Sequence, residues 1–369
     1  MPSPLEQVAW EPCILEPQRD RALEAYARRK QGIPNPAISY FAPVPWLARA
    51  LVDLHPEYGL LLRLDHGVMD LVNLVVCQEN SCRFCYAAVR AMLWAQGLSR
   101  ARIEQMERDL LRADLPPRTL AAMAFGRSQS RTGPAGARAA REALARAGVD
   151  AEEMREIAFA AALVDFSNRA HTIAAVPVRP LERMPDRLHT RLMKPLVNFL
   201  IRRSRSYGRA QPLERIPEAP HRRLLQAYAG SPIAPALGAA LEAMWASPVL
   251  ARRCKLLIFA VVARGLDCEA CGPEIVEALR KEGLSDAAIA EVLTHLDGPD
   301  LDRVERQVVS FARETIWYEP AVIQRRARAL REHLTGPEVV EAIGVASLAN
   351  GLCRLGATVL EPHENPSSQ

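Results

Sequence analysis

Two Cys-x-x-Cys pairs are the residues of this chain best suited to chemistry. Cys82 and Cys85 enclose Arg-Phe, and Cys268 and Cys271 enclose Glu-Ala. When such a pair begins a helix, the first sulfur lies at the positive end of the helix dipole, which stabilises thiolate and lowers the pKa. The second sulfur lies one turn along and can close a disulfide on the first. The spacing therefore predicts two thiol redox centres, with Ser81 and Asp267 as candidate helix caps.

Metal ligation and plain packing are the alternatives for these cysteines. Cys77, Cys82 and Cys85 spell C-x4-C-x2-C, which overlaps a plant-type iron–sulfur spacing, but the only candidate for a fourth ligand is the distant Cys13. No glycine-rich phosphate loop and no HExxH-like motif occurs. We therefore favour the redox reading and expect no cofactor and no metal.

The surroundings of the two pairs recur along the chain. Gly97-Leu98-Ser99 and Gly283-Leu284-Ser285 follow the two pairs at equal distance, an offset of 186 residues, and the same offset joins Phe125 to Phe311 and Arg127 to Arg313. Asn168 can be matched with Asn350 after a four-residue slip. A tandem duplication is the simplest explanation.

Helical periodicity dominates both copies. Apolar residues recur at three- and four-residue spacing, and no alternating run is long enough for a sheet. We expect an all-α protein with two tandem helical bundles. The predicted divisions are an N-terminal extension (1–39), a first repeat (40–188), a basic and proline-rich linker (189–231), a second repeat (232–362) and a tail (363–369).

The linker contains one amphipathic stretch. Leu192, Leu196, Phe199 and Leu200 fall on one side of a predicted helix, with arginines following. This pattern favours a connecting helix that packs its apolar side on a domain, and an interfacial membrane helix is the alternative.

The amino-acid composition limits which classes of protein this chain can belong to. The 369 residues are 49% hydrophobic and 24% charged, as in an ordinary globular protein. The net charge of +4 is mild and its charges are interspersed, so we expect no nucleic-acid partner. Neither a signal peptide nor an apolar run of membrane-spanning length is visible, and the eight cysteines are too unevenly placed for a secreted disulfide scaffold. These features predict a cytoplasmic protein.

The sequence resembles the alkyl hydroperoxidase D and carboxymuconolactone decarboxylase family. The likeness covers about residues 40 to 180 and 232 to 362, and rests on the Cys-x-x-Cys pairs, the Gly-Leu-Ser turns, the helices around Phe125 and Phe311, and the late Asn-Arg helix. It implies an all-helical unit that assembles as a homo-oligomer.

In peroxidase members of that family, a glutamate twelve residues before the first cysteine and a histidine four after the second relay protons. The corresponding positions here are Asp70 and Val89 in the first copy. In the second copy they are Leu256 and Ile275. Only Asp70 keeps a carboxylate, so the resemblance places the better-equipped centre in the first copy.

Other side chains are candidates to replace the missing relay. His66 lies four residues before Asp70 and is predicted to form either a carboxylate-oriented imidazole with it or a surface pair. His171 is a weaker candidate. Glu269 and Glu274 flank the second pair and could take a proton, although such glutamates are usually only solvated.

The leading hypothesis is a thiol-dependent oxidoreductase of the alkyl hydroperoxidase type. It would reduce a small-molecule peroxide or a disulfide partner through the Cys-x-x-Cys pairs and be recharged by a dithiol reductant protein. A carboxymuconolactone decarboxylase-like lyase is one alternative. A non-catalytic or redox-responsive scaffold is the other.

Overall fold

The fold is all-α, as the periodicity predicts. The computed structural model describes residues 5–32, 35–109, 114–131, 134–178, 188–212 and 220–360. Every regular element within these ranges is a helix, and the only β-type pairings there are isolated bridges between Tyr58 and Ser206 and between Gln211 and Gly230. The predicted tail at 363–369 lies outside the described residues.

Helices fill both halves of the chain. Those of the first half and the segment after it are α1 (Arg21–Gln31), α2 (Ile38–Phe41), α3 (Pro45–Asp53), α4 (His66–Glu79), α5 (Arg83–Ala95), α6 (Arg100–Arg108), α7 (Pro117–Arg131), α8 (Pro134–Arg146), α9 (Ala151–Ile173) and α10 (Leu188–Ser204). Those of the second half are α11 (Arg222–Ala227), α12 (Ile233–Ala246), α13 (Arg252–Gly265), α14 (Gly272–Lys281), α15 (Asp286–His295), α16 (Arg303–Glu314), α17 (Pro320–Ala329), η3 (Leu330–Glu332) and α18 (Gly336–Val359).

The order of helices repeats. Helices α4 and α13 begin and end 186 residues apart, and α7 with α16 and α8 with α17 begin at the same offset. The predicted caps also recur, because Ser99 accepts the backbone N–H of Arg102 and Ser285 accepts that of Ala288. Each half therefore supplies an equivalent set of helices around its cysteine pair.

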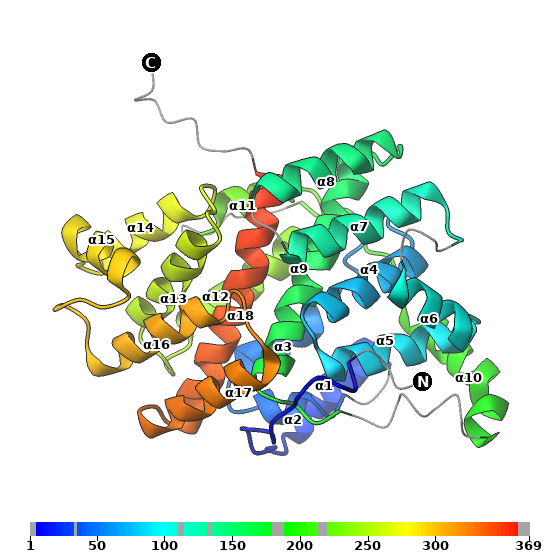
Figure 1. Ribbon diagram of the computed structural model, residues 1–369, viewed down its shortest axis with the longest axis horizontal. Helices are drawn as coiled ribbons and strands as arrows, with labels where there is room; N and C mark the ends of the chain where they lie inside the picture. Colours follow the sequence, from blue (N-terminus) through cyan, green and yellow to red (C-terminus); the bar gives the residue numbers. More distant parts are fainter. Residues whose placement is uncertain are drawn as a thin grey trace.

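The two sets interlock at the centre of the molecule. Helices α9 and α18 lie side by side there, with α4, α5 and α7 on one side and α13 to α16 on the other (Figure 1). A Cβ atom on Gly351 would lie 2.7 Å from the backbone oxygen of Ala162, so glycine allows this close approach. Helix α8 also packs on α18, and α17 packs on α9. The halves thus share one core.

The structure corrects the alignment of the two central helices. Their N-caps, Asp150 and Thr335, are 185 residues apart. At this offset Arg169 matches Arg354, and both guanidinium groups bond back to the residue four positions earlier. Asn168 consequently corresponds to Cys353 rather than to Asn350, because the chain shortens by one residue before α18 and not by four.

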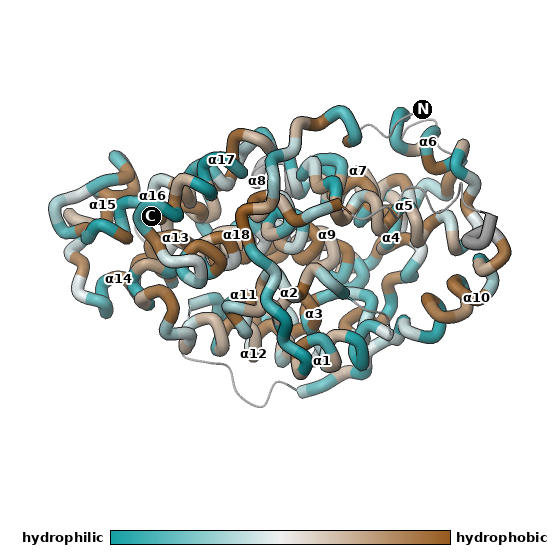
Figure 2. The backbone as a smooth tube through the Cα atoms, turned by 90° about the horizontal axis from the view of Figure 1, so that it is seen from below, coloured by the Kyte–Doolittle hydropathy of each residue, from teal (hydrophilic) through white to brown (hydrophobic). Residues whose placement is uncertain are grey.

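Helix α10 leaves its apolar side uncovered. Leu192 and Phe199 are 74% and 57% exposed, and Leu196 and Leu200 are also exposed. Among the described side chains of this helix, Val197 and Ile201 pack partly on the core, and Figure 2 shows α10 at the edge of the molecule. Helix α10 contacts α5, but Leu192 and Phe199 remain mostly uncovered by the described part of the chain.

Among the described residues one helix, α18, is long and apolar enough to cross a membrane. Of its most apolar 18-residue window, 89% is buried inside the fold. This burial is typical of the core helix of a globular protein, and α18 does occupy the core against α9 and α13.

Candidate functional site

The same tight turn precedes each cysteine pair. The backbone N–H of Cys82 donates to the carbonyl oxygen of Cys77 at 3.0 Å, and that of Cys268 donates to Ala263 at 2.9 Å. Ser81 and Asp267 adopt left-handed conformations, with φ of 48° and 53°, and neither caps the helix that follows. Cys82 itself is the N-cap of α5, as its predicted place at a helix start requires, whereas α14 begins only after Cys271.

In the first copy the second cysteine of the pair opens on a cavity. This cavity has a volume of about 150 Å³, and half-buried Cys85 forms part of its wall. Cys82 lies fully buried behind it, and its sulfur accepts the backbone N–H of Cys85 at 3.4 Å. The two thiols also bond to each other. Cys85 is therefore the sulfur that a small molecule can reach, and Cys82 is placed to close a disulfide on it.

Both thiols of this pair are protonated at neutral pH. Burial, and then the hydrogen bond with Cys85, raises the pKa of Cys82 well above its usual value. The pKa of Cys85 is raised as well, chiefly by its hydrogen bond with the thiol of Cys77. The expected lowering by the helix dipole is outweighed here, so attack by Cys85 requires a base.

Two histidines line the same cavity. The ring of His171 stacks on that of Phe84, with centroids 4.6 Å apart, and its Nδ1 lies 2.6 Å from the carbonyl oxygen of Ser167. A carbonyl oxygen only accepts, so Nδ1 carries the proton and Nε2 is the basic nitrogen of the neutral ring. His55 is half-buried, and loss of solvent lowers its pKa to about 4. Sequence reasoning ranked His171 low and missed His55, which follows α3 and carries no motif.

The two family relay positions of the first copy, Val89 and Asp70, lie in different surroundings. Val89 lines the cavity with an apolar side chain. Asp70 is fully buried, but its carboxylate accepts hydrogen bonds from Arg205 and from Gln96, each at 2.7 Å. Arg205 also pairs with buried Glu57 at 2.7 Å. Burial, and then the neighbouring carboxylate of Glu57, raises the pKa of Asp70 to about 7.

His66 does not bond to Asp70. Neither of its ring nitrogens has a hydrogen-bond partner among the residues that the structure places, and the ring packs against Tyr207 at 4.6 Å. Its pKa is lowered by burial and then by the charge of Arg205. The predicted carboxylate-oriented imidazole is therefore replaced by the Asp70–Arg205 ion pair.

In the second copy a third cysteine, Cys353, lies beside the pair. The sulfurs of Cys268, Cys271 and Cys353 lie within 4.8 Å of one another, and all three residues are buried. As a thiol, Cys268 donates to the backbone oxygen of Cys353 at 3.2 Å. As a thiolate it accepts from the Cys271 and Cys353 thiols, which lowers its pKa well below the usual value. Sequence reasoning missed Cys353, which lies in no motif.

The remaining candidates of the second copy lie in three different surroundings. Glu274 accepts the backbone N–H groups of His221 and Arg223 at the start of α11. Glu269 is exposed at the rim of a shallow depression that Cys268 also lines. Leu256 and Ile275, at the relay positions, are fully buried in the core.

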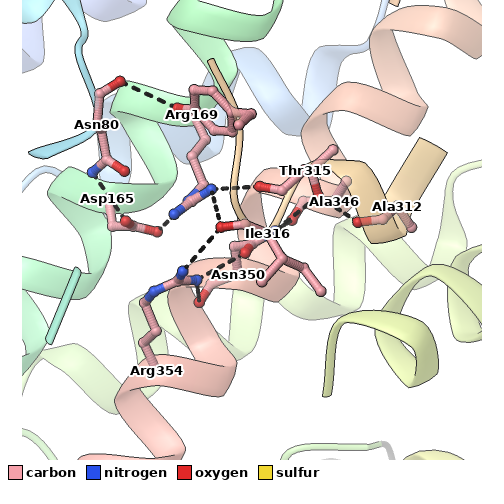
Figure 3. A network of polar contacts seen from close by, with 10 residues as sticks. Asn80, Asp165, Arg169, Ala312, Thr315, Ile316, Ala346, Asn350 and Arg354 are labelled. Atoms are coloured by element: carbon pink, nitrogen blue, oxygen red, sulfur yellow. Dashed lines mark hydrogen bonds and ion pairs between the residues drawn. The ribbon is translucent and has the colours of Figure 1, made fainter. Parts of the chain in front are cut away.

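A buried polar network joins the two central helices, α9 and α18, to the loop after α16 (Figure 3). Asp165 pairs with Arg169 at 2.8 Å and accepts from Asn80 at 3.0 Å. Arg169 donates to the backbone oxygen of Thr315, and Arg354 donates to that of Ile316 at 3.3 Å. The loop after α16 is thereby held between the two central helices.

Comparison of the chain with protein-family models, with curated proteins and with solved structures found no match.

Proposed function

We propose that this protein is a thiol-dependent oxidoreductase that reduces a small peroxide or a disulfide through Cys82 and Cys85. One observation carries the proposal: the Cys85 sulfur lies on the wall of a cavity, with the Cys82 sulfur hydrogen-bonded behind it. The resemblance to the alkyl hydroperoxidase D family supports the same activity.

The chemistry follows from the placement of the side chains. His171, which lines the same cavity, is assigned the role of taking the proton of the Cys85 thiol, and the thiolate then attacks a peroxide oxygen. The O–O bond breaks, the leaving oxygen is released as an alcohol or water, and Cys85 becomes a sulfenic acid. Cys82 attacks that sulfur, a disulfide forms and water leaves. Two electrons from a dithiol reductant protein restore both thiols.

The test is a reaction of the fully reduced protein with one equivalent of hydrogen peroxide or cumene hydroperoxide. We expect loss of two thiols and a Cys82–Cys85 disulfide in the peptide map. Cys85→Ser should abolish the reaction. Cys82→Ser should leave a sulfenic acid on Cys85 that dimedone traps.

A matched control is Cys254→Ser, because Cys254 is buried in α13 and lies outside both cysteine groups. This variant should react as the unchanged protein does. Full reactivity of Cys85→Ser would overturn the proposal. Stoichiometric oxidation without repeated turnover in the presence of a dithiol would instead indicate the redox-responsive scaffold.

Self-association into a homo-oligomer is part of the same proposal. The exposed apolar side chains of α10, Leu192 and Phe199 among them, supply surface that a second copy of the chain could bury. Sedimentation velocity of the purified protein, with Leu192→Ser/Phe199→Ser as the comparison, tests it.

A further inference from the structure

We propose that Cys268, Cys271 and Cys353 bind one soft metal ion, best matched by Cu(I), in a three-sulfur site. The inference does not depend on the redox activity proposed for Cys82 and Cys85. It rests on the positions of three sulfurs, on the charge around them and on a route to the surface.

The sulfur positions suit a common ligand. The three Sγ atoms lie within 4.8 Å of one another. When three sulfurs surround an ion in a plane at about 2.3 Å, they lie about 4 Å from one another. Small side-chain shifts would therefore bring the three sulfurs into bonding distance of one ion. Thiolate ligands select soft ions such as Cu(I) and zinc.

The number of ligands distinguishes between those ions. Within the described ranges no fourth cysteine, histidine, aspartate or glutamate belongs to the cluster. Structural zinc takes four protein ligands in a tetrahedron. Space for another donor is also limited, because a Cβ atom on Gly356 would lie 2.7 Å from the Cys271 sulfur and 3.7 Å from that of Cys268. A three-coordinate ion fits this closed site better.

Buried positive charge nearby supports an anionic centre. Arg354 follows Cys353 on α18 and is 3% exposed. Its guanidinium bonds to Asn350 and to the Ile316 carbonyl, and no carboxylate in the described part of the chain lies within 4 Å of it. Asp165, the acidic group of this network, pairs with Arg169. Asp165 is thus the one carboxylate of the network that acts on both guanidinium groups, and a thiolate-bound ion would add negative charge beside Arg354.

The first copy provides an internal contrast. Asn168 occupies the position that corresponds to Cys353, and its side-chain oxygen accepts from Cys77 at 3.4 Å. An amide oxygen is a poor ligand for a soft ion. The depression that Cys268 lines, with a volume of about 170 Å³, gives the second copy a path from solvent.

Each ligand binds as thiolate, so each cysteine that is still a thiol releases one proton when Cu(I) forms the tris-thiolate copper(I) centre, with no change of oxidation state. The experiment uses the full-length, fully reduced protein under anaerobic conditions. Cu(I) is titrated in competition with bicinchoninate, and the copper-loaded protein is examined by X-ray absorption. We expect one tightly bound Cu(I) per chain with three sulfur neighbours at about 2.3 Å.

Two variants locate the ion. Cys353→Ala should weaken Cu(I) binding by about 100-fold or more, whereas Cys254→Ala, which also removes a buried thiol, should not change it. The Cys82→Ser/Cys85→Ser variant keeps the second cluster intact and should still bind one Cu(I) with three sulfurs. Cu(I) binding by this double variant tests whether the second cluster holds the ion even if Cys353→Ala does not fold.

Three results would overturn the proposal. They are no tight binding by the unchanged protein, unchanged affinity in folded Cys353→Ala, and loss of the ion in the Cys82→Ser/Cys85→Ser variant. Tight binding of Zn(II) with a nitrogen or oxygen neighbour, and no tight Cu(I), would overturn the assignment to a three-sulfur copper site.

Discussion

The ring of His171 lies parallel to that of Phe84, at an interplanar angle of 5° and a centroid distance of 4.6 Å. Phe84 immediately precedes Cys85, so this stacking fixes the imidazole on the same cavity wall as the reactive sulfur. The Ser167 carbonyl holds Nδ1 at 2.6 Å and so sets the tautomer. In the proposed reaction His171, on α9, serves as the base in place of the histidine that the resemblance implies at position 89.

We predict that His171→Gln slows oxidation of Cys85 by peroxide by about 10² to 10⁴-fold, the usual contribution of a general base. The rate should rise again at alkaline pH, where Cys85 ionises unaided. Stopped-flow measurement of the reaction from pH 6 to 10 checks both effects. His66→Gln is the matched control, because His66 packs against Tyr207 and does not line the cavity. Equal rates in the two variants would rule out His171 as the base.

The Asp70 carboxyl makes stability depend on pH. Its pKa is raised to about 7 in the folded protein, against about 3.9 in the unfolded chain. Between these values the folded state binds more protons, so the free energy of unfolding falls as pH rises from about 4 to about 7. Urea unfolding across this range measures the slope. Asp70→Asn should flatten it, and a slope unchanged in that variant would contradict the prediction.

The Asp165–Arg169 pair is predicted to be essential to the core. Asp165→Asn leaves Arg169 and Arg354 as two buried cations without a carboxylate, which costs about 3–5 kcal/mol. The control is Glu277→Gln, which removes an exposed pair with Lys281 and should change the free energy of unfolding little. Urea unfolding at pH 7.5 compares them. Similar small losses in both variants would show that the network contributes little.

Much of the helical framework is predictable because its signals are local. Glycines 97 and 283 end helices and Ser99 and Ser285 begin the next ones, and these features need only neighbouring residues. The 186-residue offset likewise follows from the sequence, and the first residues of α7 and α16 are separated by that offset.

The site could be predicted only in part, because its decisive contacts join distant residues. Asp70 takes its counter-ion from Arg205, 135 positions later, and Cys268 meets Cys353 across 85 positions. No periodicity or spacing rule connects such pairs. The match of Asn168 with Asn350 was wrong because it assumed a four-residue shortening before α18. The chain shortens there by one residue, and on a helix a different shift places each residue on another side.

The close contact of the two central helices makes a last prediction. A Cβ atom on Gly351 would lie 2.7 Å from the Ala162 carbonyl oxygen and 3.3 Å from the Phe166 Cβ, so Gly351→Ala must push α18 away from α9. We expect a loss of about 1–3 kcal/mol in the free energy of unfolding, as for other overpacked cores. Gly336→Ala, at the first position of the same helix with open space around it, should change stability by about 0.5 kcal/mol or less. Because the halves share this contact, thermal unfolding should remain a single transition that shifts as a whole. Two separate transitions, with only one of them moved by Gly351→Ala, would show that the halves fold independently.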